Sequence, residues 1–143
     1  MSLTVSILVI NSISLSAKHN AYKKNFGYIH ERKITINKKN GNLLGLDHLT
    51  AENSDNKFSN TYSIRFHLYP GINAVQTIGK NSVLIQMEKN KSLIFTAINK
   101  NIILEESIFL GRNQIINNSC ITISGILKKQ QNKKICWELN KNY

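Results

Sequence analysis

Apolar and polar residues alternate with a period of two along most of the chain. In residues 62–69, one parity holds Tyr62, Ile64, Phe66 and Leu68, and the other holds Ser63, Arg65, His67 and Tyr69. Successive side chains of a β-strand point to opposite faces, so this pattern predicts a half-buried strand. Similar runs occur at residues 28–37, 81–87, 91–98, 101–111, 114–125 and 133–140. No segment keeps a helical period, so the sequence predicts a chain of short strands.

Turn residues separate these runs, in the segments "KKNGN", "YPGIN", "IGKN", "EKNK" and "LGRN". Gly and Asn tolerate a positive φ, and Pro fixes its own φ. The segment "IQMEKNKSLIFTA" predicts a tight hairpin with its loop at residues 88–91. Turns spaced about 8–12 residues apart favour an all-β fold, an antiparallel β-sandwich of roughly eight to ten short strands. With 143 residues and no repeat or linker, we expect one domain over residues 1–143.

The first fifteen residues predict a first β-strand. Val5, Ile7 and Val9 alternate with other residues, and Ile13 and Leu15 follow. The stretch is too short and too polar to span a bilayer as a helix. It lacks the basic region of a signal peptide, although Ala17 stands at a plausible cleavage position. The sequence therefore leaves the compartment open, cytoplasmic or periplasmic.

The net charge of +11, from nineteen basic and eight acidic residues, predicts attraction to polyanions. The lysines are spread along the chain, so general surface charge is an alternative to a functional patch. Only three arginines occur, and the aromatic residues are spread along the strands. This composition disfavours nucleic acid, whose recognition prefers guanidinium groups and stacked aromatic platforms.

Motifs of known catalytic chemistry are missing from the sequence. It contains no Gly-rich phosphate loop, no paired metal-ligand motif and no nucleophile elbow, so we expect no cofactor and no metal. Cys120 and Cys136 lie in apolar runs, which predicts buried free thiols. A bridge between them is the alternative if the protein is exported.

Arg65 and His67 are the candidate catalytic residues. They lie two residues apart in a predicted strand and so share a face. Arg65 can neutralise a carboxylate through two hydrogen bonds, and His67 can donate to an oxygen. The alternative is the polar outer face of a half-buried strand. Asp47 and His48 are adjacent and point to opposite faces, so we do not expect them to act as a dyad.

Four segments together resemble the C-terminal β-sandwich region of bacterial heparinase II/III-like proteins. They are "KHNAYKKNFGYIHERKITINKKNGNLLGLDHLT", "YSIRFHLYPGINAV", "ILEESIFLGRNQ" and "ICWELNK", and they cover residues 16–141. The positions that follow the family's first block are His19, Tyr22, Phe26, Gly27, Ile29, His30, Arg32, Gly45 and Asp47, whereas Asn20, Ala21 and Leu46 depart from it. On this resemblance, His30 and Arg32 join Arg65 and His67 as predicted substrate-binding residues.

The resemblance implies an architecture of the polysaccharide-lyase type, in which an α-helical toroid packs on the sandwich. Such enzymes cleave acidic glycans by β-elimination. It therefore implies an acidic polysaccharide as partner, and an upstream-encoded α/α-toroid chain. The family's reacting groups lie on the toroid and on a paired-histidine segment, neither of which this sequence contains. We therefore expect a domain that is not catalytic alone, and residues 1–15 as a replacement first strand on a gene fragment or split gene. Alternatives are a stand-alone acidic-glycan-binding module and a basic nucleic-acid-binding β-protein.

Overall fold

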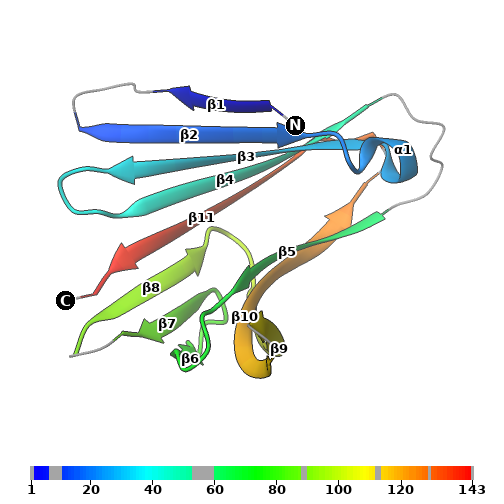
Figure 1. Cartoon of the computed structure of the whole chain (residues 1–143). Coiled ribbons are helices and arrows are strands. Elements are labelled where there is room, and N and C mark those ends of the chain that lie inside the picture. The colour runs from blue at the N-terminus through cyan, green and yellow to red at the C-terminus, as the bar shows by residue number, and fades with distance from the viewer. Residues whose placement is uncertain are drawn as a thin grey trace. The chain divides into compact units, whose positions relative to one another are not determined.

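The computed structural model describes residues 2–6, 11–52, 60–87, 90–111, 114–128 and 130–142, and these are nearly all in strands (Figure 1). The elements are β1 (Ser2–Ser6), β2 (Ser12–His19), α1 (Lys23–Phe26), β3 (Tyr28–Asn37), β4 (Leu43–Ala51), β5 (Asn60–His67), β6 (Asn73–Gln76), β7 (Ser82–Gln86), β8 (Ser92–Ala97), β9 (Ile103–Gly111), β10 (Gln114–Leu127) and β11 (Lys133–Lys141). The strands form two antiparallel sheets, so the predicted all-β antiparallel fold class is confirmed.

The described residues divide into two compact units. The first unit comprises residues up to 62 together with residues 125–138, and the second comprises residues 63–124 and those from 139 onward. Strands β5, β10 and β11 each contribute residues to both units. That residues 1–143 form a single domain stays a prediction.

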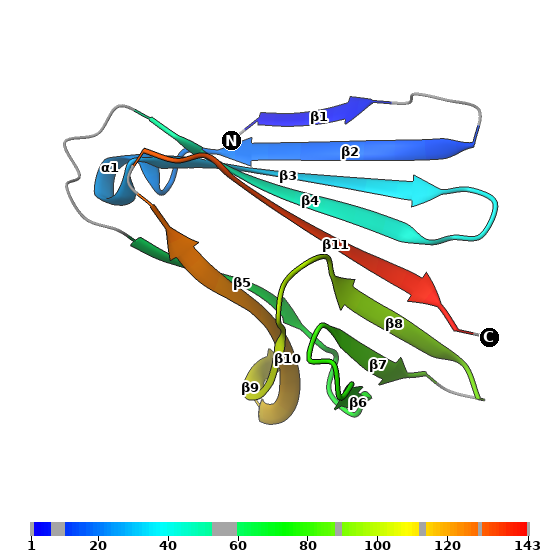
Figure 2. The same cartoon turned by 180° about the vertical axis from the view of Figure 1, so that it is seen from behind.

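In the first unit, neighbouring strands follow the order β1-β2-β3-β4-β11, which Figure 2 shows from behind. The registers between β1 and β4 are antiparallel, with Leu15 opposite Ile34 and Arg32 opposite Asp47. The segment predicted as one first strand contains β1 and the start of β2, while Ile7 and Val9 lie outside the described residues.

Trp137 lies among the buried residues of this first unit, with Tyr28, Leu49, Leu127 and Ile135. The Trp137 indole packs directly against Gly45 on β4, because a Cβ at position 45 would overlap the ring. Gly125 lies in the same way against the ring of Tyr62, whose hydroxyl oxygen would lie 2.6 Å from an added Cβ. Each large ring therefore depends on one residue that has no side chain.

The second unit contains the antiparallel strands β6, β7 and β8, and the end of the chain lies beside β8, where the Asn142 amide donates to the Ser92 carbonyl at 3.0 Å. The predicted hairpin is confirmed: Gln86 pairs with Ser92, and the Met87 amide donates to the Lys91 carbonyl at 2.7 Å. Residues 88–89 of its loop lie outside the described residues.

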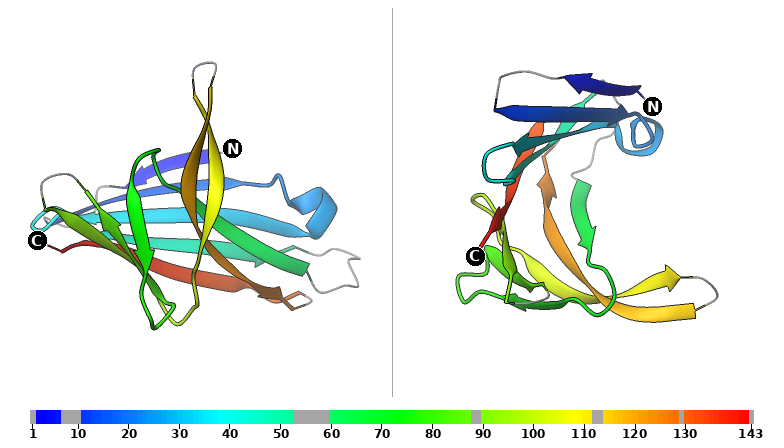
Figure 3. Two further views of the ribbon diagram at one scale, coloured as in Figure 1. Left: turned by 90° about the horizontal axis from the view of Figure 1, so that it is seen from below. Right: turned by 60° about the vertical axis from the view of Figure 1, so that its left-hand side comes forward.

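The other sheet has the order β5-β10-β9, in which β9 and β10 form a long twisted ribbon (Figure 3). On β5 the predicted alternation is confirmed. Tyr62 and Ile64 are buried, whereas Ser63, Arg65 and His67 are exposed. The exposed residues of β5 therefore present a polar face, and it is the face on which the candidate catalytic residues were predicted.

Both cysteines are free. Cys120 is buried, as predicted, but the prediction is wrong for Cys136, which is partly exposed. Ile135 and Trp137 flank Cys136 on β11 and are both buried, so the alternation of the strand turns Cys136 to the opposite face.

We expect Gly45→Ala to destabilise the protein by about 1–3 kcal/mol or more, because the new methyl group overlaps the Trp137 ring. Urea unfolding measures the loss. Gly79→Ala is the matched control, since the nearest atom to its added Cβ is the movable Asn81 Oδ1 at 3.3 Å. Equal stability of the two variants would contradict the packing of Trp137 against Gly45.

In the native protein, we expect Ellman's reagent to modify Cys136 before Cys120, because only Cys136 is partly exposed. Cys120 should react at the rate of unfolding. The variant Cys136→Ser isolates the slow thiol, and fast modification of that variant would show that the centre of β10 is open to solvent.

Candidate functional site

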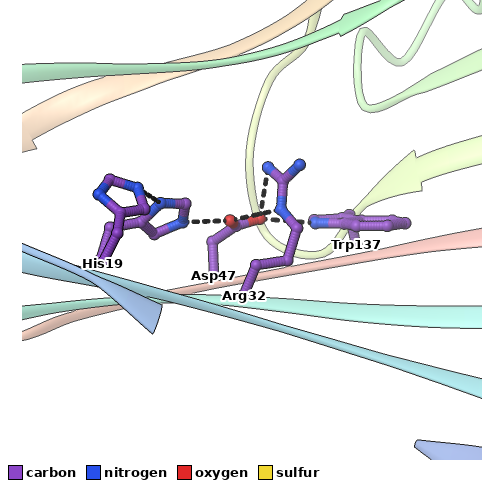
Figure 4. Close-up of polar contacts among 5 residues, drawn as sticks. His19, Arg32, Asp47 and Trp137 are labelled. Atoms are coloured by element: carbon purple, nitrogen blue, oxygen red, sulfur yellow. Dashed lines mark hydrogen bonds and ion pairs between the residues drawn. The ribbon is translucent and has the colours of Figure 1, made fainter. Parts of the chain in front are cut away.

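A buried carboxylate, that of Asp47 on β4, is bonded to side chains of two other strands (Figure 4). Asp47 is 0% exposed. His30 Nε2 lies 2.6 Å from Asp47 Oδ1, Arg32 Nε donates to the same oxygen at 2.8 Å, and Trp137 Nε1 donates to Oδ2 at 2.8 Å. A second Arg32 nitrogen, Nη2, donates to Oδ2 at 3.2 Å. Both oxygens are therefore satisfied, as a buried charge requires.

The strand registers bring these groups together. Arg32 on β3 stands directly opposite Asp47, and His30 lies two residues earlier on the same face. Trp137 comes from β11, the other neighbour of β4. Its indole reaches Asp47 because Gly45, two residues before Asp47 on the same face, carries no side chain.

The pKa of the Asp47 carboxyl is lowered. Burial alone would raise this pKa, but the hydrogen bonds from His30, Arg32 and Trp137, together with the positive charge of Arg32, outweigh burial. Asp47 is therefore ionised at neutral pH. An ionised carboxylate only accepts hydrogen bonds, so His30 Nε2 must be the donor in their contact.

His19 on β2 extends this chain of hydrogen bonds. It stands opposite His30, and its Nε2 lies 3.1 Å from His30 Nδ1. The Ala21 amide donates to His19 Nδ1 at 3.4 Å, so a neutral His19 carries its proton on Nε2 and donates it to His30. Burial and the neighbouring His30 lower the pKa of His19. The chain Ala21–His19–His30–Asp47 thus runs in one direction and fixes both imidazole rings.

Arg65 and His67 lie in the second unit, on the exposed face of β5. Their partners are on β9, so the side chains meet above the central strand β10: Arg65 Nε lies 3.5 Å from Glu105 Oε1, and His67 Nδ1 lies 3.0 Å from Ser107 Oγ. The Thr122 hydroxyl of β10 donates to the same Glu105 oxygen at 2.5 Å. Arg65 remains 58% exposed in its side chain.

Of the predicted substrate-binding residues, His30 and Arg32 meet at Asp47, and Arg65 and His67 share the β5 face. Their role toward a substrate stays a prediction. Sequence reasoning missed Asp47, Trp137 and His19 as members of the network. His48 is not a hydrogen-bond partner of Asp47 in the described part of the chain, and the partners instead come from β3 and β11. The register of the hairpin between β3 and β4 would have revealed Asp47 as the partner of Arg32. Trp137 and His19 depend instead on the pairing of this hairpin with β11 and β2.

Within the described ranges, no three His, Cys, Asp or Glu side chains gather as a metal site. No helix in the same ranges is long and apolar enough to cross a membrane.

The chain belongs to the heparinase II/III-like, C-terminal family, whose model matches residues 7–138. No curated protein sequence matches it. Among solved structures, heparan sulfate lyase HepC from Pedobacter heparinus has a TM-score of 0.79 at 14% identity, over 97% of this chain and 21% of that one. A structure of heparinase III has a TM-score of 0.78 at 14% identity, over 98% and 21%. These likenesses show the fold, and the chain spans about a fifth of the length of those proteins.

We expect Asp47→Asn to destabilise the protein by about 3 kcal/mol or more, because the amide places a donor where Arg32 or Trp137 already donates. The native stability should also fall as the pH drops below the ordinary carboxyl range of about 4, through the lowered pKa of Asp47. This part of the acid loss should vanish in the variant.

Urea unfolding at several pH values measures both effects. Glu106→Gln serves as the control, since it removes an exposed carboxylate and should change stability by less than about 0.5 kcal/mol. An acid profile that is the same in Asp47→Asn and in the native chain would contradict an ionised Asp47.

Proposed function

We propose that the chain acts as the β-domain of a polysaccharide-lyase-type protein, contributes to holding an acidic glycan, and does not cleave the glycan alone. The observation that carries the proposal is a net charge of +11 on a member of a heparinase II/III-like family. One structural relative is a heparan sulfate lyase, and the substrate in that protein's name is an acidic polysaccharide.

The absence of autonomous catalysis rests on how the acid and base groups are used. β-Elimination needs a group that neutralises the uronate carboxylate, a base for the C5 proton and an acid for the leaving oxygen, all converging on one sugar. Both ring nitrogens of His30 are occupied, Nε2 by Asp47 and Nδ1 by His19. Arg32 is bonded to Asp47 through two of its nitrogens, so neither residue is available as an independent acid or base. Arg65 and His67 lie on the exposed face of a sheet, where water has access to both side chains.

Charge spread over the surface supports binding of a glycan. Among the described residues, the carboxylates with an ion-pair partner are Glu52, Asp47 and Glu105. Lys18 and Lys39 have no ion pair within this part of the chain. Such exposed lysines attract a polyanion over a range of about 8 Å at physiological salt.

We expect the purified chain to release no unsaturated uronate from heparin, heparan sulfate or alginate, as measured by the ultraviolet absorbance of the product. It should nevertheless bind immobilised heparin and elute near physiological salt. Release of product by the native chain that is lost in Arg65→Ala or His67→Ala would overturn the non-catalytic part. Failure to bind heparin at low salt would overturn the glycan-holding part.

A further inference from the structure

Six side chains, three of them exposed and three half-buried, form a continuous row on the sheet of β5, β10 and β9 within the second unit. Arg65, His67 and Tyr69 come from β5 and the residues that follow it, and Glu105, Ser107 and Phe109 come from β9. We call this row the Arg65 face. Its cross-strand contacts are Arg65 with Glu105, His67 with Ser107 and Tyr69 with Phe109. Residues two apart in a strand are separated by about 6.6 Å, so the row extends for about 13 Å.

An aromatic pair stands at one end of the Arg65 face. The rings of Tyr69 and Phe109 have centroids 5.7 Å apart and are tilted by 58°. Tyr69 is nevertheless 72% exposed, so most of its ring is open to solvent. An exposed Tyr provides a rigid apolar surface with a polar hydroxyl, which suits the apolar face of a sugar ring bordered by hydroxyl groups.

Groups that recognise anions stand along the rest of the row. The Arg65 guanidinium has Glu105 as its ion-pair partner among the described residues, at the long distance of 3.5 Å. Glu105 itself is held by the shorter bond from Thr122. His67 is oriented through Nδ1 by Ser107, and its Nε2 has no partner within the described part of the chain. A carboxylate or sulfate can therefore replace Glu105 at Arg65 while Thr122 keeps Glu105 in place.

We propose that the Arg65 face is the contact site for the acidic glycan, with Tyr69 against a sugar ring and Arg65 and His67 on an acidic substituent. This inference rests on the proposed function and deepens it, because it assigns the binding to one face instead of to diffuse surface charge. Glu105 acts against binding in the free protein, since its charge competes with the ligand for Arg65.

The sign of the mutational effect separates this site from a structural ion pair. Arg65→Gln should weaken binding of a size-defined heparin oligosaccharide by about tenfold or more. Glu105→Gln should strengthen it at low salt, because the competing charge is removed. Tyr69→Ala should weaken it by about threefold to tenfold, and this loss should persist at higher salt, since an aromatic contact is not screened.

Matched controls come from the first unit. Tyr22→Ala removes another exposed Tyr, and Lys33→Gln removes another exposed cation. Both should change the dissociation constant by less than about twofold, because diffuse charge contributes little per residue. The slow thiol of Cys120, buried on β10 two residues from Thr122, reports whether each variant keeps the fold of this sheet.

Titration calorimetry at two salt concentrations gives the dissociation constants. The proposal is supported if Arg65→Gln and Glu105→Gln change affinity in opposite directions and Tyr69→Ala weakens it, with Cys120 still protected. If the native chain binds and these variants match the Tyr22→Ala and Lys33→Gln controls, the Arg65 face is overturned while the proposed function stands. If the native chain does not bind the oligosaccharide, the proposed function fails, and the assignment of the face fails with it.

Discussion

The ionised carboxylate of Asp47 is the constraint on which the first unit depends. A charge buried without partners would cost several kcal/mol, so the fold must bring hydrogen-bond donors to both of its oxygens. It does so with His30 and Arg32 of β3 and with Trp137 of β11. Trp137 is ninety residues from Asp47 in the sequence. The carboxylate of Asp47 therefore connects the two segments of chain that form the first unit, residues up to 62 and residues 125–138. The strand order β3-β4-β11 and the absence of a side chain at Gly45 are both conditions for it.

The strands could be predicted from the sequence because a strand buried on one face alternates apolar and polar residues along the chain. Residues 62–69 alternate as expected, and the hairpin between β7 and β8 forms where Asn and Lys residues interrupt two apolar runs. Cys136 shows the limit of this reasoning. Cys136 lies in an apolar run, but the alternation of β11 buries Ile135 and Trp137 on one face of the strand. Cys136 points to the opposite face and is partly exposed.

The Asp47 network could not be predicted because it depends on the register of one turn. A two-residue turn at Asn40 and Gly41 would place Arg32 opposite Leu49. In the structure the Asn37 amide donates to the Asn42 carbonyl and Gly41 adopts φ 73°, so the loop is longer and Arg32 stands opposite Asp47. A shift of two residues preserves the face and changes the partner. Period-two patterns therefore reveal which residues are buried together, but not which of them touch.

The contacts of the Arg65 face were beyond sequence reasoning for a different reason. That Arg65 and His67 share a face follows from their spacing. Glu105 and Ser107, however, belong to β9, which is separated from β5 by β10. The side chains of β5 and β9 meet there across β10, where Cys120 and Thr122 have small side chains. These contacts depend on the order of strands in the sheet. That order pairs segments that are far apart in the chain, and the alternation within one strand does not reveal it.

Trp137 is the only tryptophan of the chain. All indole fluorescence of the protein therefore originates from one ring, and the nitrogen of that ring is bonded to Asp47. The emission spectrum is consequently a local probe of the buried carboxylate as well as of folding. The emission wavelength of this single residue shifts when water reaches the space between β4 and β11. Fluorescence of the native sequence therefore reports whether these two strands stay paired around Asp47.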